Sequence, residues 1–281
     1  MDQRIINLYD EYTHKPLKRS EFIERLVVLT GSITAAMSVI PLLESCAAPN
    51  KATTDEVFTD RVSYDGVNGK MNAYIARPQK QDKYAAVMVI HENRGLNAHI
   101  EDVTRRVAKA GFLAIAPDAL SPVGGTPADT DKARDLFSKL DAKQNLQNFI
   151  NGLNYVKARN DSNGSTGCVG FCWGGAMANQ LAVNVPELKA AVAFYGSQPK
   201  AEDVPKIKAA VQLHYAGLDE RINAGIAVYE QALKAAGTSY ELYMYENVNH
   251  AFHNDTSAAR YNETAARLAW QRTMDFFKKH L

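Results

Sequence analysis

The residues best suited to chemistry form the segment Gly170-Phe171-Cys172-Trp173-Gly174, in which a cysteine is flanked at two positions on either side by glycine. This spacing is typical of a nucleophile held in a strained turn between a strand and a helix, where glycines leave room for neighbouring backbone. An apolar run precedes the segment, and residues 174–183, rich in small helix-forming side chains, follow it. The N-terminus of such a helix favours an anionic sulfur. Cys172 is therefore the predicted nucleophile.

An acid and a base follow the cysteine along the chain. Asp219 comes after the apolar run 211–216, and Glu220 is its nearest competitor. His250 lies in a loop between a predicted strand and the last helix. The order nucleophile, acid, base is that of the α/β-hydrolases. In a triad of this kind His250 takes the thiol proton and turns its other nitrogen toward Asp219. The alternative for Asp219 is a turn residue or helix cap.

A metal site is the competing interpretation of the histidines. His253 lies three residues after His250, so the pair could bind a metal ion, as in a metal-dependent hydrolase. Such a site would be completed by His91, Glu92 and Asp118. It leaves the glycine-flanked cysteine unexplained, so no metal is predicted. The histidines outside this loop are expected to be structural or exposed: His14, His99, His214 and His280.

The composition is ordinary for a folded soluble protein and indicates one large domain. The chain has 281 residues, of which 46% are hydrophobic and 22% charged, enough for a sizeable core. Its formal charge of +1 supplies no field that would recruit nucleic acid. The three cysteines, an odd number, do not describe a disulfide framework. Cys168 and Cys172 would lie about 13 Å apart on one strand, too far to bridge. Cys168 is expected to be a buried structural thiol.

The chain after residue 53 alternates short apolar runs with helical segments. This pattern predicts an α/β fold, a mostly parallel sheet with helices on both faces. Strands are expected at 71–77, 85–91, 112–117, 167–171, 190–195, 211–216 and 239–245. Helices are expected at 104–111, 129–159, 174–183, 222–236 and 258–278. The loop 118–127 follows a strand end, where ligands bind in open α/β sheets, and is expected to border the pocket.

The first fifty residues are a separate unit, so the predicted division is 1–50 and 51–281. A basic pair, Lys18 and Arg19, precedes the uncharged stretch 26–43 and small residues at 45–48, the order of an export signal. Lys18-Arg19-Ser20-Glu21-Phe22 is similar to a twin-arginine motif with Lys in the first position. Contact of residues 18–48 with export machinery or a membrane is expected, which favours a periplasmic or cell-envelope location over the cytoplasm. The alternative is an uncleaved helical extension that packs on the body or a partner.

Over residues 55–281 the chain resembles the dienelactone hydrolase family, the carboxymethylenebutenolidases of the α/β-hydrolase superfamily. The matching segments beside the cysteine elbow are His91-Glu92-Asn93-Arg94-Gly95, Ala116-Pro117-Asp118, Phe194-Tyr195-Gly196, Gly217-Leu218-Asp219 and His250-Ala251-Phe252. The resemblance implies that Cys172 attacks an ester or enol-lactone carbonyl and that water hydrolyses the acyl-enzyme. It also implies that no metal or organic cofactor is needed.

The resemblance implies roles for three further residues. Glu92 would pair with the resting thiol and be displaced when substrate arrives. The backbone N–H groups of Trp173 and Asn93 would form the oxyanion hole, in which one donor is typically worth about 3 kcal/mol.

The substrate-binding residues depart from the family pattern. Archetypal members bind a substrate carboxylate with arginines in two regions that here contain none, 119–122 and 252–254. The candidate substitutes are Arg94 and Arg221, and Tyr195 is a candidate to line the pocket. The expected function is hydrolysis of a small-molecule ester, lactone or thioester, although dienelactone itself is not implied. A binding protein that kept the fold without the chemistry is the non-enzyme alternative.

Overall fold

The computed structural model describes residues 1–44 and 57–281 and contains an eight-stranded sheet. The strand order is β1-β2-β4-β3-β5-β6-β7-β8. The strands from β3 to β8 run parallel to one another, and β2 is antiparallel to both of its neighbours, β1 and β4. Their bounds are β1 Val57–Gly66, β2 Gly69–Pro78, β3 Tyr84–Ile90, β4 Leu113–Pro117, β5 Ser162–Phe171, β6 Ala190–Phe194, β7 Ala210–Ala216 and β8 Tyr240–Tyr245.

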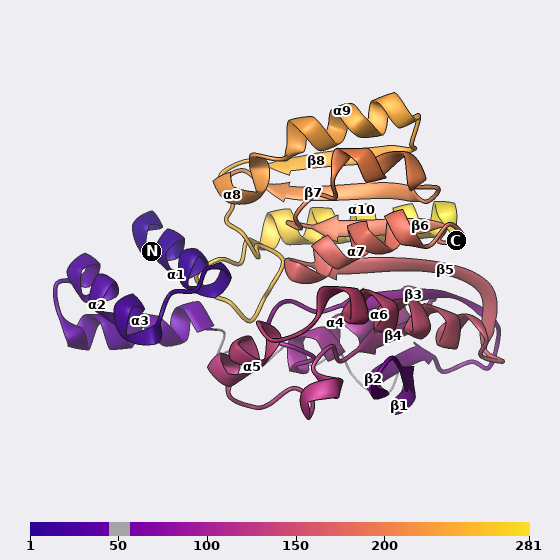
Figure 1. Ribbon diagram of the computed structural model, residues 1–281, viewed down its shortest axis with the longest axis horizontal. Coiled ribbons are helices and arrows are strands. Elements are labelled where there is room, and N and C mark those ends of the chain that lie inside the picture. The colour runs from indigo at the N-terminus through magenta and orange to yellow at the C-terminus, as the bar shows by residue number, and fades with distance from the viewer. Residues whose placement is uncertain (45–56) are drawn as a thin grey trace.

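Helices cover both faces of this sheet (Figure 1). Because side chains alternate along a strand, Val87 and Val89 of β3 pack in one core and Met88 and Ile90 in the other. The first core includes α4 (Ala98–Lys109) and α10 (Glu263–His280). The second includes α6 (Ala142–Lys157), α7 (Trp173–Asn184) and α9 (Ile226–Ala236). The predicted α/β-hydrolase architecture is confirmed.

Several element bounds differ from the sequence-based expectation because polar caps decide them. Helix α4 begins at Ala98, earlier than expected, since the Asn97 side chain accepts a hydrogen bond from the Ile100 N–H. The helical stretch 129–159 divides into α5 (Thr130–Phe137) and α6, which Asp141 caps. The edge strand β1 was not expected, because its residues are mostly exposed and show no buried stripe.

The loop 118–127 does not line the cavity at Cys172, so that expectation is wrong. Its carboxylate, Asp118, accepts hydrogen bonds from the backbone and hydroxyl of Thr126 at 2.8 and 2.7 Å, which folds the loop onto itself around the short helix η2 (Ser121–Val123). The loop lines a groove with β1 instead. The next segment, 130–138, reaches the cavity.

Residues 1–44 fold into three helices, α1 (Gln3–His14), α2 (Arg19–Thr30) and α3 (Ile33–Glu44). They enclose a small core of their own that includes Tyr12, Phe22 and Leu26, all nearly inaccessible. Figure 1 shows these helices beyond the carboxyl ends of the strands, next to the loops that follow them. The small residues expected at 45–48, including Cys46, lie outside the described residues.

No single helix in the described ranges is long and apolar enough to cross a membrane. Helices α2 and α3 meet the length and composition test only as a pair, and the pair is bent by 111°.

Candidate active site

Cys172 lies at the turn between β5 and α7, with φ 56° and ψ −114°. This positive φ is strained for a side chain larger than glycine, as in a nucleophile elbow. Its neighbours have to be glycines: a Cβ on Gly170 would lie 1.8 Å from the Gly174 carbonyl oxygen, and one on Gly174 would lie 2.3 Å from the Ile90 oxygen. The local sequence therefore produces the turn that holds Cys172 between the end of β5 and the start of α7.

Asp219 and His250 are brought together from the ends of β7 and β8. The His250 Nδ1 lies 2.5 Å from Asp219 Oδ2, and both side chains are buried. Asp219 also caps the short helix α8 (Glu220–Asn223), because its Oδ1 accepts a hydrogen bond from the Ile222 N–H. The capping role and the role as partner of His250 are therefore compatible. The other ring nitrogen, His250 Nε2, makes no hydrogen bond within the described chain.

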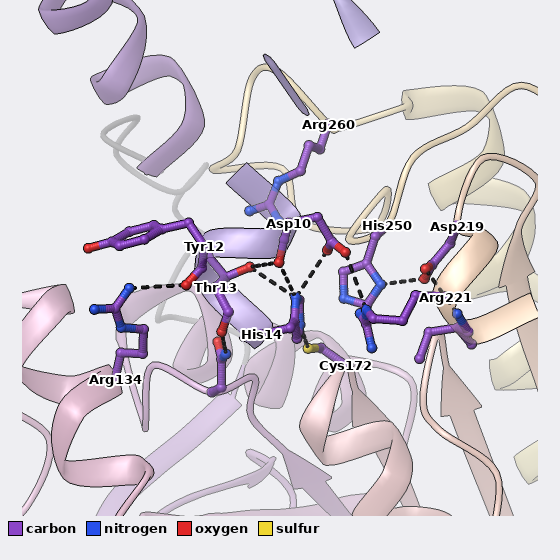
Figure 2. A network of polar contacts seen from close by, with 12 residues as sticks. Asp10, Tyr12, Thr13, His14, Arg134, Cys172, Asp219, Arg221, His250 and Arg260 are labelled. Carbon is purple, nitrogen blue, oxygen red and sulfur yellow. Dashed lines mark hydrogen bonds and ion pairs between the residues drawn. The ribbon is translucent and has the colours of Figure 1, made fainter. Parts of the chain in front are cut away.

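His14, which the sequence suggested was structural or exposed, contacts the sulfur directly. Its Nε2 lies 3.1 Å from Cys172 Sγ, at the C-terminal end of α1 (Figure 2). A ring nitrogen of His14, one of His250 and the sulfur all lie within 4.8 Å of one another. The sequence carried a signal for this residue: an apolar stripe on 3–14 predicts a packed helix, and Asp10 lies one turn before His14.

The charges around the sulfur favour a thiolate. Burial raises the pKa of the Cys172 thiol, but the His14 and His250 imidazoles outweigh it and lower that pKa from 9.0 to about 6. Burial lowers the pKa of His250, yet the Cys172 thiolate and Asp219 raise it to about 10. Burial raises the pKa of the Cys168 thiol to about 12, against a smaller lowering by a backbone hydrogen bond at Val192. The two thiols thus differ in pKa, while the role of Cys172 as the nucleophile stays a prediction.

The residues that the family resemblance assigned lie around the same sulfur with partners of their own. Glu92 Oε2 accepts a hydrogen bond from Asn254 Nδ2 at 2.9 Å, and Glu92 lines a cavity with Cys172. Asn93 Nδ2 donates to the Thr13 carbonyl oxygen at 2.9 Å. The pairing of Glu92 with the thiol and the oxyanion role of the Asn93 N–H stay predictions.

The candidate substrate-binding residues also line the cavities beside Cys172. Arg94 Nη1 donates to the Thr130 carbonyl oxygen, while its Nη2 is buried and has no partner in the described part of the chain. Arg221 Nε donates to Asp10 Oδ2 at 3.3 Å. Tyr195 is buried, and its hydroxyl has no partner among the described residues. Each of these groups therefore retains some capacity to bind a polar substrate group.

Two cavities meet at His14 and Cys172. One, about 190 Å³, is lined by Glu92, Arg94 and His250. The other, about 840 Å³, is lined by Trp173, Tyr195 and residues of α1. The larger volume suits a small organic molecule.

His253 is not part of this constellation. Its buried ring stacks on Phe171 with centroids 4.9 Å apart and also lies against Phe194 and Trp270. Burial moves its pKa well below 6.5. His253 therefore belongs to the core beneath the site, and it lines neither cavity at Cys172.

Comparison with known proteins extends over most of the chain. Residues 71–281 match the family described as the dienelactone hydrolase family. The chain belongs to the dienelactone hydrolase family. Two curated relatives carry the name "Putative carboxymethylenebutenolidase". The protein of Escherichia coli O157:H7 is 34% identical over 242 residues, covering 80% of this chain and 89% of that protein. The protein of Yersinia pestis is 33% identical over 226 residues, covering 75% and 84%.

Solved structures agree with this assignment. The "Putative Dienelactone Hydrolase" of Klebsiella pneumoniae superimposes with a TM-score of 0.73 at 31% identity, covering 80% of this chain and 99% of that one. The dienelactone hydrolase of Anabaena variabilis gives a TM-score of 0.62 at 19% identity with the same coverage, which shows a shared fold. As a member of this family, the chain is a dienelactone hydrolase-like hydrolase.

Proposed function

We propose that the protein hydrolyses small-molecule esters, lactones or thioesters through a Cys172-Asp219-His250 triad. The observation that carries this proposal is the convergence of three chain segments at one strained cysteine, with Asp219 on the far nitrogen of His250. This arrangement is the nucleophile, base and orienting acid of covalent acyl transfer.

In the first half-reaction, the Cys172 sulfur attacks the substrate carbonyl carbon. The charge that develops on the carbonyl oxygen is stabilised by the backbone N–H groups of Trp173 and Asn93 in the oxyanion role, each worth about 3 kcal/mol. The carbon–oxygen bond to the leaving group then breaks, and the departing oxygen takes a proton from His250. The product of this step is a thioester between the acyl group and Cys172.

In the second half-reaction, neutral His250 acts as the base. It removes a proton from water, whose oxygen attacks the thioester carbonyl, and the carbon–sulfur bond breaks to release the acid. Asp219 keeps the His250 ring in one orientation and stabilises the imidazolium form. Cys172 returns to the thiolate that the surrounding charges favour.

The substrate class is set by size and by the available cations. The larger cavity has room for a small organic acyl group. Arg94 lines the smaller cavity, and its Nη2, which has no hydrogen-bond partner in the described chain, is the candidate for a substrate carboxylate or carbonyl oxygen. Arg221 lines the larger cavity and is a second candidate; each arginine is also ion-paired, Arg221 with Asp10 and Arg94 with Asp131. A neutral or singly charged ester or lactone fits these features better than a multiply charged one.

A panel of chromogenic esters and lactones tests the mechanism with the wild-type protein, Cys172→Ala and Cys172→Ser. Cys168→Ala is the matched control, since that thiol lies in β5 just before the turn that holds Cys172, and burial raises its pKa. We expect Cys172→Ala to abolish turnover and Cys168→Ala to retain it. Activity that survives Cys172→Ala contradicts the mechanism, activity lost on adding a chelator favours the metal-dependent alternative, and an inactive wild type on every substrate favours a binding protein.

A further inference from the structure

Helix α1 delivers a second imidazole to the nucleophile. His14 Nε2 lies 3.1 Å from Cys172 Sγ, and the His14 ring meets the His250 ring edge-on with centroids 4.9 Å apart. Figure 2 shows both histidines next to Cys172, with His14 from α1 and His250 from the loop before α10. The sulfur is therefore contacted by a residue from outside the part of the chain that matched the family.

His14 is also held through its Nδ1, by a backbone carbonyl oxygen with a carboxylate close by. Its Nδ1 lies 2.9 Å from the Asp10 carbonyl oxygen and 3.1 Å from Asp10 Oδ1, so Nε2 is the nitrogen that faces the sulfur. Asp10 is in turn held by Arg221, which follows the catalytic Asp219. The chain therefore places two carboxylate–histidine pairs on one cysteine.

Polar contacts hold α1 over the site. The Thr13 carbonyl oxygen accepts from Asn93, and the Tyr12 carbonyl oxygen accepts from Arg134 at 3.1 Å. The Arg134 guanidinium also lies 4.0 Å from the Tyr12 ring centre. At the other end of the helix, Gln3 Nε2 donates to Asn249 Oδ1 at 2.6 Å. Contacts at both ends fix the position of His14.

The position of α1 leaves space for substrate. The cavity of about 840 Å³ lies between α1 and the body, with His14, Pro16 and Leu17 on one side and Trp173 and Tyr195 on the other. Cys172 lines this cavity too, so His14 forms part of the cavity wall beside the nucleophile.

We propose that His14 is a further catalytic residue, an imidazolium that shares with His250 the task of holding the Cys172 sulfur as a thiolate. This inference rests on the proposed cysteine mechanism and adds a group to it. When the sulfur attacks, its lone pair forms the carbon–sulfur bond and the contact with His14 weakens. His250 delivers the proton to the leaving oxygen, and His14 keeps its own proton throughout.

The charged groups that face His14 agree with this role. They are Asp10 on its own helix, Cys172 and His250 from the body, and Arg221 behind Asp10. Burial lowers the pKa of His14, but the Cys172 thiolate and Asp10 raise it from 6.5 to about 9. The repulsion from His250 is smaller than these attractions. A protonated His14 beside a thiolate is thus the favoured state near neutral pH.

The full-length variant His14→Gln tests the proposal, with His280→Gln, at the far end of α10, as the matched control. The pH dependence of Cys172 alkylation by iodoacetamide is followed by mass spectrometry of the peptide that contains Cys172. We expect the wild-type and His280→Gln midpoints near pH 6 and a His14→Gln midpoint at least about one unit higher, which lowers the thiolate fraction at pH 6 about fivefold. Turnover of a chromogenic ester at pH 6 should fall by a similar factor.

Asp10→Asn is a second variant that preserves the His14 contact, and we expect a smaller upward shift of the same midpoint. An unchanged midpoint in both variants, with Cys172→Ala inactive, overturns the assignment of His14 and leaves the proposed function standing. Faster turnover in His14→Gln also overturns it, because α1 would then be inhibitory. Activity in Cys172→Ala instead removes the triad on which the inference rests.

Discussion

The two carboxylate–histidine pairs at Cys172 are built in different ways. Asp219 and His250 are 31 residues apart and meet because β7 and β8 end side by side. Asp10 and His14 are one helical turn apart, and their meeting needs only α1. The first pair is part of the sheet's geometry, whereas the second reaches the sulfur only if a separately packed helical segment docks. From this difference we expect the first pair to be essential for turnover and the second to adjust the thiolate.

Loss of the Asp219–His250 pair should have the largest effect on turnover. His250→Gln removes the base and the proton donor, so we expect kcat to fall roughly 10³-fold or more. The comparison variant His14→Gln should retain most of its kcat at pH 8, because His250 still lowers the pKa of the thiol in that variant. Steady-state kinetics on one chromogenic ester measure both. Equal losses in the two variants would contradict the division of roles.

The elbow that presents the sulfur should be the next most sensitive feature. A Cβ at Gly170 would lie 1.8 Å from the Gly174 oxygen, so we expect Gly170→Ala to destabilise the fold by more than about 3 kcal/mol. Gly225→Ala is the control, since a Cβ there meets only the end of the flexible Gln198 side chain. Urea unfolding compares the two. A Gly170→Ala protein as stable as the control would show that the turn tolerates a side chain.

The ion pair between the two regions should make docking of α1 depend on pH. The pKa of His14 is raised from 6.5 to about 9 by Cys172 and Asp10 against the effect of burial, so its contribution to stability is present below 6.5 and lost as the pH rises through 9. Despite burial, His14 and His250 lower the pKa of Cys172 from 9.0 to about 6, so its contribution is lost as the pH falls through 6. The His14 imidazolium and the Cys172 thiolate are therefore present at the same time only between about pH 6 and pH 9.

We therefore expect the difference in thermal stability between wild type and His14→Gln to be largest from about pH 6 to 9. Melting temperatures at pH 5, 7.5 and 10 measure it, with Cys172→Ala as a control in which the window should vanish. The same difference at all three pH values would show that His14 stabilises the segment through packing alone.

Loss of a single hydrogen bond at α1 should have the smallest effect. Tyr12 donates to the carboxylate oxygen Asp131 Oδ1 at 2.8 Å, and Tyr12→Phe removes only this hydrogen bond, which is worth about 1.5–3 kcal/mol because the acceptor is charged. We expect Tyr12→Phe to speed amide hydrogen exchange in α1 and to leave the exchange rates in the sheet unchanged. Tyr64→Phe, which removes a bond to the Asn148 carbonyl oxygen within the body, is the control. If the two variants loosen α1 equally, the helical segment and the body unfold together.

The parts of the fold with a strong local pattern were predicted from the sequence. The apolar runs that became β3, β5, β6 and β7 and the small residues of α7 were identified because a parallel strand buried on both faces needs a continuous apolar segment. The edge strand β1 was missed, since a strand paired on one side and largely exposed carries no such constraint. The loop 118–127 was misplaced because a side-chain network around Asp118 turns it away.

The sequence by itself determined the elbow, because glycine spacing and a strained cysteine are local requirements, and it identified Asp219 and His250 through chain order. Only the tertiary structure decided which of the remaining histidines reach the sulfur. His253 packs in the core against Phe171, Phe194 and Trp270, whereas His14 is 158 residues from Cys172 in sequence yet in contact with it. Docking of α1 depends on single polar contacts with loops such as the one at Asn93, and no periodicity in the chain encodes such contacts.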